Sequence, residues 1–90
     1  MIAPDTQPKL ARGVRLREDP VRGGWNLLAP ERVLRASDTA AAILALCDGT
    51  RSFATIVDTL VLGYKVERER IEQDTAALLE DLAGKGMVEL

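Results

Sequence analysis

Cys47 is the residue best suited to chemistry in this sequence, because it is the only cysteine and the chain has no histidine. A single cysteine cannot close an internal disulfide, and without histidine neither a Cys/His zinc site nor a His-based triad can form. Cys47 ends an apolar run in which Ala40, Ile43 and Leu44 share its helical face. A thiol on such a face behaves as a small apolar group. We therefore expect a structural cysteine, no catalytic residue, no metal and no cofactor.

Acidic side chains are the second candidates, since paired carboxylates can do acid–base work. The segment from Glu67 to Asp81 carries six of them, but Lys65, Arg68 and Arg70 lie beside or among them. Mixed charges at this spacing are typical of a solvated, salt-bridged helix face. We expect a charged surface here and not an acid–base site.

Trp25 is the third candidate, because an indole next to Gly23-Gly24 could stack against a ligand. A lone tryptophan in a small domain more often belongs to the core. The two glycines match no phosphate-binding loop, since neither a Lys-Ser/Thr pair nor a helix start follows them. We expect Trp25 in the core.

The elements that position these residues form one small domain, because 90 residues leave no room for a second core. No apolar span approaches the roughly 20 residues of a membrane helix, and residues 1–10 lack the pattern of a signal peptide. These features predict a cytoplasmic protein with no membrane partner.

The charge is unevenly distributed although the net charge is only −2. Residues 1–35 hold seven Lys and Arg against four Asp and Glu, whereas residues 36–90 hold five against ten. The acidic half is the half with helical periodicity. This argues against a helix that enters a nucleic-acid groove, since phosphate contacts need basic side chains.

The first part of the chain predicts a flexible arm followed by a small sheet. Residues 1–9 contain two prolines and little apolar content, which is typical of a mobile terminus. Val14–Arg17, Trp25–Leu28 and Val33–Ala36 show strand-like patterns separated by turn residues. We expect a three-stranded antiparallel meander, and residues 10–90 as one domain.

Beyond residue 36 the apolar period changes from two to 3.6, which predicts three helices. Ser37 caps a helix from residue 38 to about 47, and Ser52 caps a second helix that ends near Gly63. A third helix spans about residues 67–85. Residues 87–90 form a short apolar tail that suits a last strand.

The sheet edge is the feature that suggests a partner, because an unpaired edge is a template for another strand. Capture of a peptide by such an edge is a known mode of recognition. Val33–Ala36 carries apolar residues on both faces, which a simple solvent-facing edge does not need. From the residues alone, an incidental apolar face is an equally good interpretation, and pairing of two copies into a homodimer through exposed edges is a third.

Several segments form one pattern when they are taken together, namely Leu27-Leu28-Ala29-Pro30-Glu31, Ser37-Asp38-Thr39-Ala40-Ala41, Ile43-Leu44-Ala45-Leu46-Cys47-Asp48-Gly49-Thr50, Ile56, Leu60, Gln73-Asp74, Leu79 and Leu82. This pattern resembles the PqqD family, the small peptide chaperones of pyrroloquinoline quinone (PQQ) biosynthesis. The resemblance covers about residues 10–90. Ser37 stands where the family usually has Asn, Thr75 replaces a typical Val, and Met87 takes a place often held by Trp.

This resemblance implies an α+β, winged-helix-like domain, a three-stranded antiparallel sheet followed by a three-helix bundle. It implies a non-catalytic protein that binds a ribosomally made PqqA-like precursor peptide. The partner would be a PqqE-like radical S-adenosylmethionine (SAM) enzyme, which links a glutamate to a tyrosine of that peptide.

The resemblance also implies where the peptide binds. It would add as a strand beside Arg32, Val33, Leu34 and Arg35, and lie against the third helix. On that helix the expected wall is Arg68, Ile71, Glu72, Thr75 and Leu79. The opposite flank, with Arg70, Asp74 and Asp81, is the alternative and a face for the partner enzyme.

A winged-helix DNA-binding regulator is the competing hypothesis, because it uses the same elements. A DNA reader needs several Lys and Arg on its third helix. Here that helix carries six acidic residues against two arginines from Glu67 to Asp81. The charge therefore favours the peptide-binding adaptor and no nucleic-acid partner.

Overall fold

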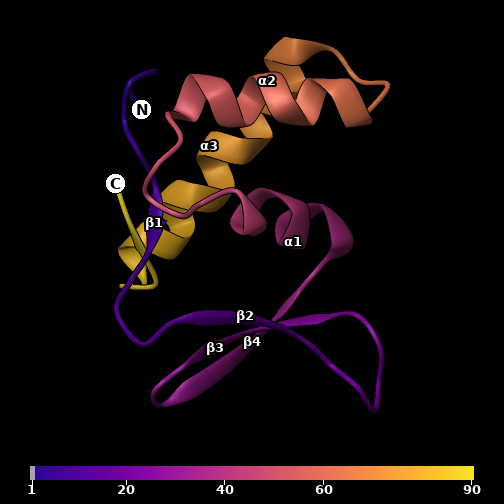
Figure 1. The fold of residues 1–90 in the computed structure, drawn as a ribbon, viewed down its shortest axis with the longest axis vertical. Helices are drawn as coiled ribbons and strands as arrows, with labels where there is room; N and C mark the ends of the chain where they lie inside the picture. The colour runs from indigo at the N-terminus through magenta and orange to yellow at the C-terminus, as the bar shows by residue number, and fades with distance from the viewer. Residues whose placement is uncertain (1) are drawn as a thin grey trace.

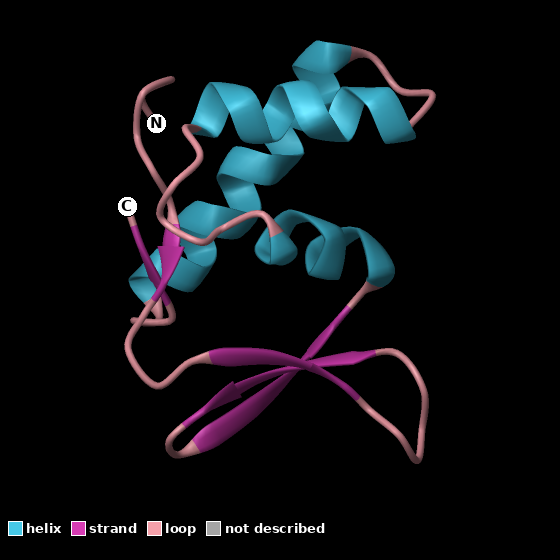
Figure 2. Ribbon diagram, viewed as in Figure 1, coloured by secondary structure: helices cyan, strands magenta, loops and turns pink. Residues whose placement is uncertain are grey.

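The structure, a computed structural model, describes residues 2–90 and confirms an α+β fold. Along the chain the elements are β1 (Lys9–Leu10), β2 (Arg15–Glu18), β3 (Trp25–Ala29), β4 (Arg32–Ala36), α1 (Asp38–Ala45), α2 (Phe53–Gly63), α3 (Arg68–Gly84) and β5 (Val88–Glu89). All three helices lie on one side of the sheet formed by β2, β3 and β4 (Figure 1, Figure 2). Within residues 2–90 no helix combines the length and the apolar character needed to cross a membrane.

The main sheet has the expected meander order, β2-β3-β4, with antiparallel neighbours. Ala29 pairs with Arg32 across a two-residue turn, and Leu27 pairs with both Leu16 and Leu34. These three leucines point to the helix side, where Leu27 is 1% exposed. β4 is therefore an outer strand that follows the middle strand through a tight turn.

The helix starts follow the sequence closely. The Ser37 hydroxyl accepts from the Ala40 amide at 3.1 Å, and the Ser52 hydroxyl accepts from the Thr55 amide at the same distance. Each caps one of the amides that a first helical turn leaves without a backbone partner. α3 begins after Glu67 with no side-chain cap, so its position depends more on packing.

The N-terminal segment differs from the flexible arm expected over residues 1–9. Met1 lies outside the described residues, but Ile2 is only 8% exposed and Pro8 is fully buried. The carbonyl of Thr6 accepts from the Phe53 amide at 2.7 Å, so the segment satisfies a first-turn donor of α2. Ile2 also belongs to the same buried cluster as Val88.

β1 and β5 form a second, two-stranded antiparallel sheet that joins the two ends of the chain. Lys9 pairs with Glu89 and Leu10 with Val88. The strand expected at residues 87–90 is confirmed by β5, whereas β1 was not expected, because its partner lies at the far end of the sequence.

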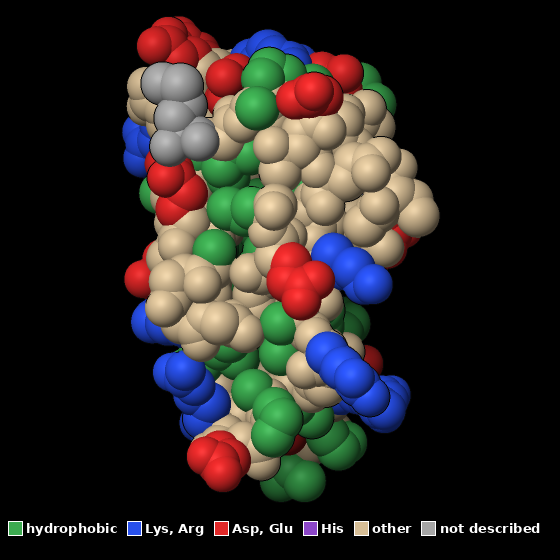
Figure 3. Space-filling view, turned by 90° about the vertical axis from the view of Figure 1, so that its left-hand side faces the viewer, with side chains coloured by type: hydrophobic (Ala, Val, Ile, Leu, Met, Phe, Trp, Pro, Cys, Tyr) green, Lys and Arg blue, Asp and Glu red, His purple; other side chains and the backbone are tan. Residues whose placement is uncertain are grey.

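Charge on the surface follows the asymmetry seen in the sequence. In Figure 3, which faces the side of the N-terminal segment, most of the visible Lys and Arg side chains lie in the lower half, at the level of the main sheet. The basic half of the chain thus surrounds the strands, and the acidic half covers the helices.

Candidate functional site

Within residues 2–90, β4 pairs with a strand on one side only, so its outer edge is open to another strand. The Asp19 amide donates to the Gly24 carbonyl at 2.8 Å, next to the paired Glu18 and Trp25. Hydrogen-bonded and non-bonded residue pairs alternate along an antiparallel ladder. This one bond therefore identifies which residue pairs in the sheet exchange backbone hydrogen bonds and which do not. It predicts that Leu34 bonds inward to β3, while the amides and carbonyls of Val33 and Arg35 point outward.

A groove lies between β4 and the C-terminal half of α3, with a volume of about 220 Å³. Its floor is made of leucines from four elements, namely Leu27, Leu34, Leu44, Leu78 and Leu82. Arg35, Ala36, Ala40, Asp81 and Lys85 complete the lining. We call this feature the β4–α3 groove.

Charged side chains close one end of the β4–α3 groove. The Arg32 guanidinium donates to the Lys85 carbonyl at 2.9 Å, across 53 residues of sequence. Lys85 in turn forms an ion pair of 2.9 Å with Asp81, one helical turn earlier. The site thus combines backbone donors and acceptors along β4, an apolar floor and a polar rim, which suits an extended peptide with alternating side chains.

The four expected strand residues all lie on β4, but they differ in what they offer. Leu34 points into the groove, and Arg32 sits at its closed end. Val33 is 60% exposed on the opposite face of the sheet. The Arg35 guanidinium also lies on that opposite face, where it pairs with Asp19 at 3.3 Å and donates to the Gly23 carbonyl.

Asp19 holds the β2–β3 loop together. Its carboxylate accepts from the amides of Arg22 and Val21, at 3.0 and 2.9 Å, and from the Asn26 side chain at 3.2 Å. These hydrogen bonds, led by the Arg22 amide, lower the pKa of Asp19 to about 2, and the Arg35 charge adds to them. The Arg35 side chain therefore braces this loop and is not free for a peptide.

We expect this carboxylate to make stability fall at acid pH. The pKa of Asp19 is below its ordinary value of 3.8 in the fold, so its stabilising effect is complete above that value and is lost as the pH falls through about 2. Asp19→Asn should lower the melting temperature at pH 5, but should melt close to the wild type at pH 2. Thermal unfolding at both values measures this, with Asp5→Asn as a charge-matched control. An equal difference in melting temperature between Asp19→Asn and the wild type at both pH values would contradict a stabilising role of the ionised Asp19 carboxylate.

The structure places the residues of the expected helix wall on different surfaces of α3. Leu79 is 0% exposed and lies in the core, so it cannot line an open groove. Arg68 pairs with Asp58 of α2, and Glu72 lines hollows together with Ile2 of the N-terminal segment. The structure therefore does not bring this flank of α3 next to β4.

The opposite flank of α3 faces β4 instead, through Leu78, Asp81 and Lys85. Of these three, only Asp81 was expected on a candidate binding face, as part of the alternative flank, whereas Leu78 was expected to face the core. The flank with Arg68 and Glu72 lies beside Ile2 of the N-terminal segment instead. Spacing could have identified this second stripe, because residues 74, 78, 81 and 85 recur at helical intervals.

The two remaining residues of the expected wall, Ile71 and Thr75, lie on α3 but farther along the same cleft. Together with Ile43 of α1 they border a second cavity, described below. Both are buried, at 9% and 1% exposure. They are close to the β4–α3 groove without being part of it.

The acidic face of α3 is salt-bridged as expected. Arg70 pairs with Asp74 at 3.1 Å, and Asp81 with Lys85. Trp25, expected in the core, is only half-buried at the start of β3. The structure thus gives neither feature a chemical site of its own.

Cys47 is buried, as expected, with 3% exposure. Its thiol donates to the Ile43 carbonyl at 3.3 Å. Burial raises the pKa of Cys47 to about 11, and the neighbouring Asp48 charge contributes. The thiol is therefore protonated at neutral pH and unreactive.

We expect Cys47→Ala to keep full peptide affinity and to lower the free energy of unfolding by about 1 kcal/mol, as is usual for loss of a small buried group. Denaturant melts and calorimetry with the peptide measure the two quantities. In the wild type, a thiol reagent should label Cys47 only after unfolding. A folded Cys47→Ala variant that no longer binds would show that the thiol has a functional role.

Comparisons with known proteins agree on one family. The family model for coenzyme PQQ synthesis protein D (PqqD) matches residues 24–88, from the β2–β3 loop to β5. A Rhodopseudomonas palustris (strain HaA2) protein named PqqA binding protein is 48% identical over 87 residues, covering 97% of this chain and 85% of that protein.

Solved structures that share the fold include a PqqD truncation and lasso peptide synthetase B1. The solution NMR structure of the PqqD truncation of Methylobacterium extorquens PqqCD is described as a functional, stand-alone recognition element for ribosomally synthesized and post-translationally modified peptides (RiPPs). It matches with a TM-score of 0.84 and 39% identity, over 100% of this chain and 96% of that chain. Lasso peptide synthetase B1, complexed with its leader peptide, matches with a TM-score of 0.79 and 28% identity, over 93% of this chain and 99% of that one.

Proposed function

The chain belongs to the PqqD family, and from this premise we propose that it binds a PqqA-like precursor peptide along β4 and presents it to a radical SAM enzyme for Glu–Tyr cross-linking. The names of the relatives support the first half, since the R. palustris protein is a PqqA binding protein. The similar synthetase B1 structure, which holds a leader peptide, supports peptide capture by this fold.

The observation that carries the proposal is the coincidence of an open strand edge with an apolar groove on the same strand. A guest strand beside β4 gains backbone hydrogen bonds at Val33 and Arg35. Alternate side chains of the guest then enter the β4–α3 groove and contact Leu34 and Leu78 in its floor. Backbone pairing supplies affinity and the groove supplies specificity.

We propose that the protein itself does no chemistry. Its thiol is buried and protonated, and two carboxylates of its acidic helix face, Asp74 and Asp81, form ion pairs with Arg70 and Lys85. Cross-linking then falls to the radical SAM partner, and the adaptor contributes positioning. A ribosomally made precursor places this work in the cytoplasm.

A homodimer that forms through the exposed edge of β4 would compete with the peptide for the same strand. A second copy that paired with β4 would occupy the amides and carbonyls that the peptide needs. Dimers that use β4 should therefore dissociate when the peptide is added.

The DNA-binding alternative is not favoured by the position of the charges. α3 faces β4 with Leu78 and the Asp81–Lys85 pair, and it lacks the row of free basic side chains that phosphates require.

An NMR titration of the labelled protein with its PqqA-like precursor tests the proposal. The largest amide shifts should fall on β4 and on residues 78–85 of α3, and a peptide of the same composition in scrambled order should give none. Shifts confined to β2 or to the N-terminal segment would refute the site, and no binding would refute the function.

A further inference from the structure

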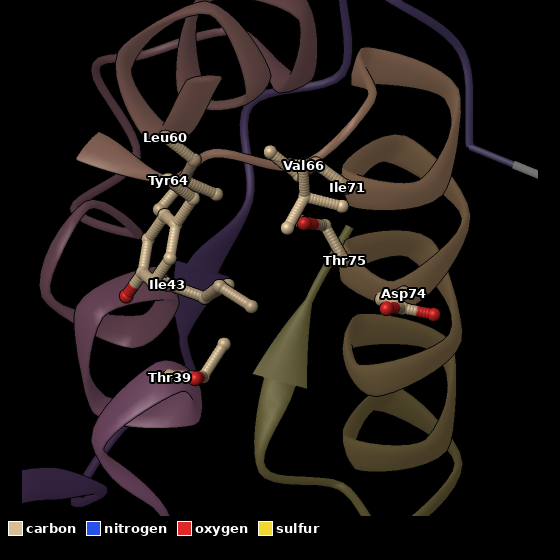
Figure 4. Close-up of a pocket in the computed structure, with 8 residues that line it drawn as sticks. All are labelled: Thr39, Ile43, Leu60, Tyr64, Val66, Ile71, Asp74 and Thr75. Carbon is tan, nitrogen blue, oxygen red and sulfur yellow. The ribbon is translucent and has the colours of Figure 1, made fainter. Parts of the chain in front are cut away.

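A second cavity, which we call the α1–α3 cavity, lies beyond the C-terminal end of β4. It has a volume of about 220 Å³ and lies between α1, the end of α2 and the first half of α3 (Figure 4). Ile43, Leu60 and Ile71 form its buried apolar walls, at 4%, 5% and 9% exposure. Tyr64 and Val66, at 37% and 49% exposure, stand at its mouth in the loop before α3.

The α1–α3 cavity continues the β4–α3 groove. α1 lines the groove with Ala40 and the cavity with Thr39, and α3 lines them with Leu78 and Thr75. From Leu82 to Thr75 the distance along α3 is about 10 Å, at ~1.5 Å per residue. An extended peptide covers this distance with about three residues, at ~3.3 Å each.

The direction of β4 leads a guest strand toward this cavity. Arg32, at the start of β4, is bound to the C-terminal end of α3, while Ala36, at its end, is followed by Ser37, the cap of α1. A strand beside β4 therefore leaves the sheet next to Ala36 and meets the cleft between α1 and α3.

We propose that the α1–α3 cavity binds one apolar side chain of the same precursor peptide, aliphatic or aromatic, about three residues away from the peptide residue that contacts Leu82. This inference rests on the proposed function and adds a second anchor to it. The cavity is small compared with pockets for drug-sized ligands, which run from roughly 300 to 1,000 Å³, so it suits a side chain and not a cofactor.

The walls also exclude an acidic side chain. Asp74 lies at the rim and already shares its carboxylate with Arg70, at 3.1 Å. The other polar side chains in the lining carry hydroxyls, among them that of Thr75, which points inward in Figure 4. Among the described residues that line the cavity there is no basic side chain to pair with a guest carboxylate.

Isoleucine methyl groups give a direct test, because Ile43 and Ile71 line the cavity whereas Ile2 and Ile56 do not. With methyl-labelled protein, the precursor peptide should shift Ile43 and Ile71 and give nuclear Overhauser contacts from them to one apolar peptide residue. Alanine at that peptide residue should remove these contacts and weaken binding about tenfold. A peptide that shifts β4 amides but leaves both methyls unchanged would overturn the proposal while the proposed function stands.

Filling the cavity provides a second test. Thr39→Trp places an indole at the mouth and should weaken peptide binding at least tenfold, and Val66→Asp should act in the same direction from the opposite side. Thr59→Trp, on the exposed side of α2, is the matched control and should stay within twofold of the wild type. If folded Thr39→Trp and Val66→Asp both bind at wild-type affinity, or if only the radical SAM enzyme shifts the methyls, the cavity does not hold the peptide. Failure of the wild type to bind any precursor would instead refute the proposed function.

Discussion

Replacing Val33 with proline should abolish binding of the precursor peptide while leaving the protein folded. The Val33 amide points away from β3, so its loss removes a donor from the guest and not from the sheet. Edge strands tolerate proline, and Arg32 already has the extended backbone that precedes a proline. The ring also blocks close approach of the guest strand. We expect a loss of at least about 30-fold, or ~2 kcal/mol, in affinity.

Glu18→Pro on β2 is the control for this experiment. Glu18 lies on the opposite edge of the same sheet, is exposed, and its amide also points outward by the same alternation. The affinity of the Glu18→Pro variant for the peptide should stay within about twofold of the wild-type affinity. Calorimetry with the peptide and a thermal melt should be run on both variants. Equal losses at the two edges would mean that proline acts through the fold and not through β4.

Leu34→Pro separates the two sides of β4. The Leu34 amide faces β3, and the side chain packs beside Leu27 in the groove. Proline here leaves a carbonyl of the middle strand unpaired, which costs about 1–3 kcal/mol of folding stability. The melting temperature should therefore fall for Leu34→Pro and change little for Val33→Pro. If the melting temperature fell more for Val33→Pro than for Leu34→Pro, the Val33 amide would face β3 and the Leu34 amide would point outward.

Leu78→Asp should cause the second large loss of peptide affinity. Leu78 is half-buried on the side of α3 that faces β4, and it forms part of the groove floor. A carboxylate there must lose water when a guest side chain arrives, and no apolar contact replaces it. We expect a loss of about 30-fold or more, the size typical of a central interface residue.

Ala77→Asp provides a matched control, because it makes the same charge change one residue earlier on the same helix. Ala77 is exposed and lines a hollow beside Ile2, on the flank that does not face β4. Calorimetry should give a near wild-type affinity for Ala77→Asp. If Ala77→Asp or Glu72→Lys weakened binding more than Leu78→Asp, the peptide would lie on the flank first expected from the sequence.

The departures at the N-terminal segment and on α3 concern the same surface. Residues 1–9 were expected to be mobile, and the flank of α3 with Arg68 and Glu72 was expected to bind the peptide. In the structure Ile2 packs on that flank, and β1 pairs with β5. The N-terminal segment thus covers this flank, while the stripe through Leu78 and Asp81 faces β4.

The sequence by itself determined the features that depend on neighbouring residues. Ser37 and Ser52 start α1 and α2 because a cap acts within three residues. The turn at residues 30–31 and the alternation of β3 and β4 set the hairpin. Burial of Cys47 was predicted from its apolar neighbours, although α1 ends at Ala45 and Cys47 lies in the turn that follows it. The family resemblance, carried by the same segments, gave the peptide-binding role.

The tertiary structure alone decided which side of α3 belongs to the site. Helical periodicity places Leu78 and Leu79 at opposite borders of one apolar stripe, about 100° apart, and propensity does not distinguish them. Leu79 is fully buried and Leu78 lines the groove, because segments far away in sequence, residues 2–10 and β5, cover one border and β4 stands beside the other. Such a choice depends on contacts between the two ends of the chain, and no local pattern encodes it.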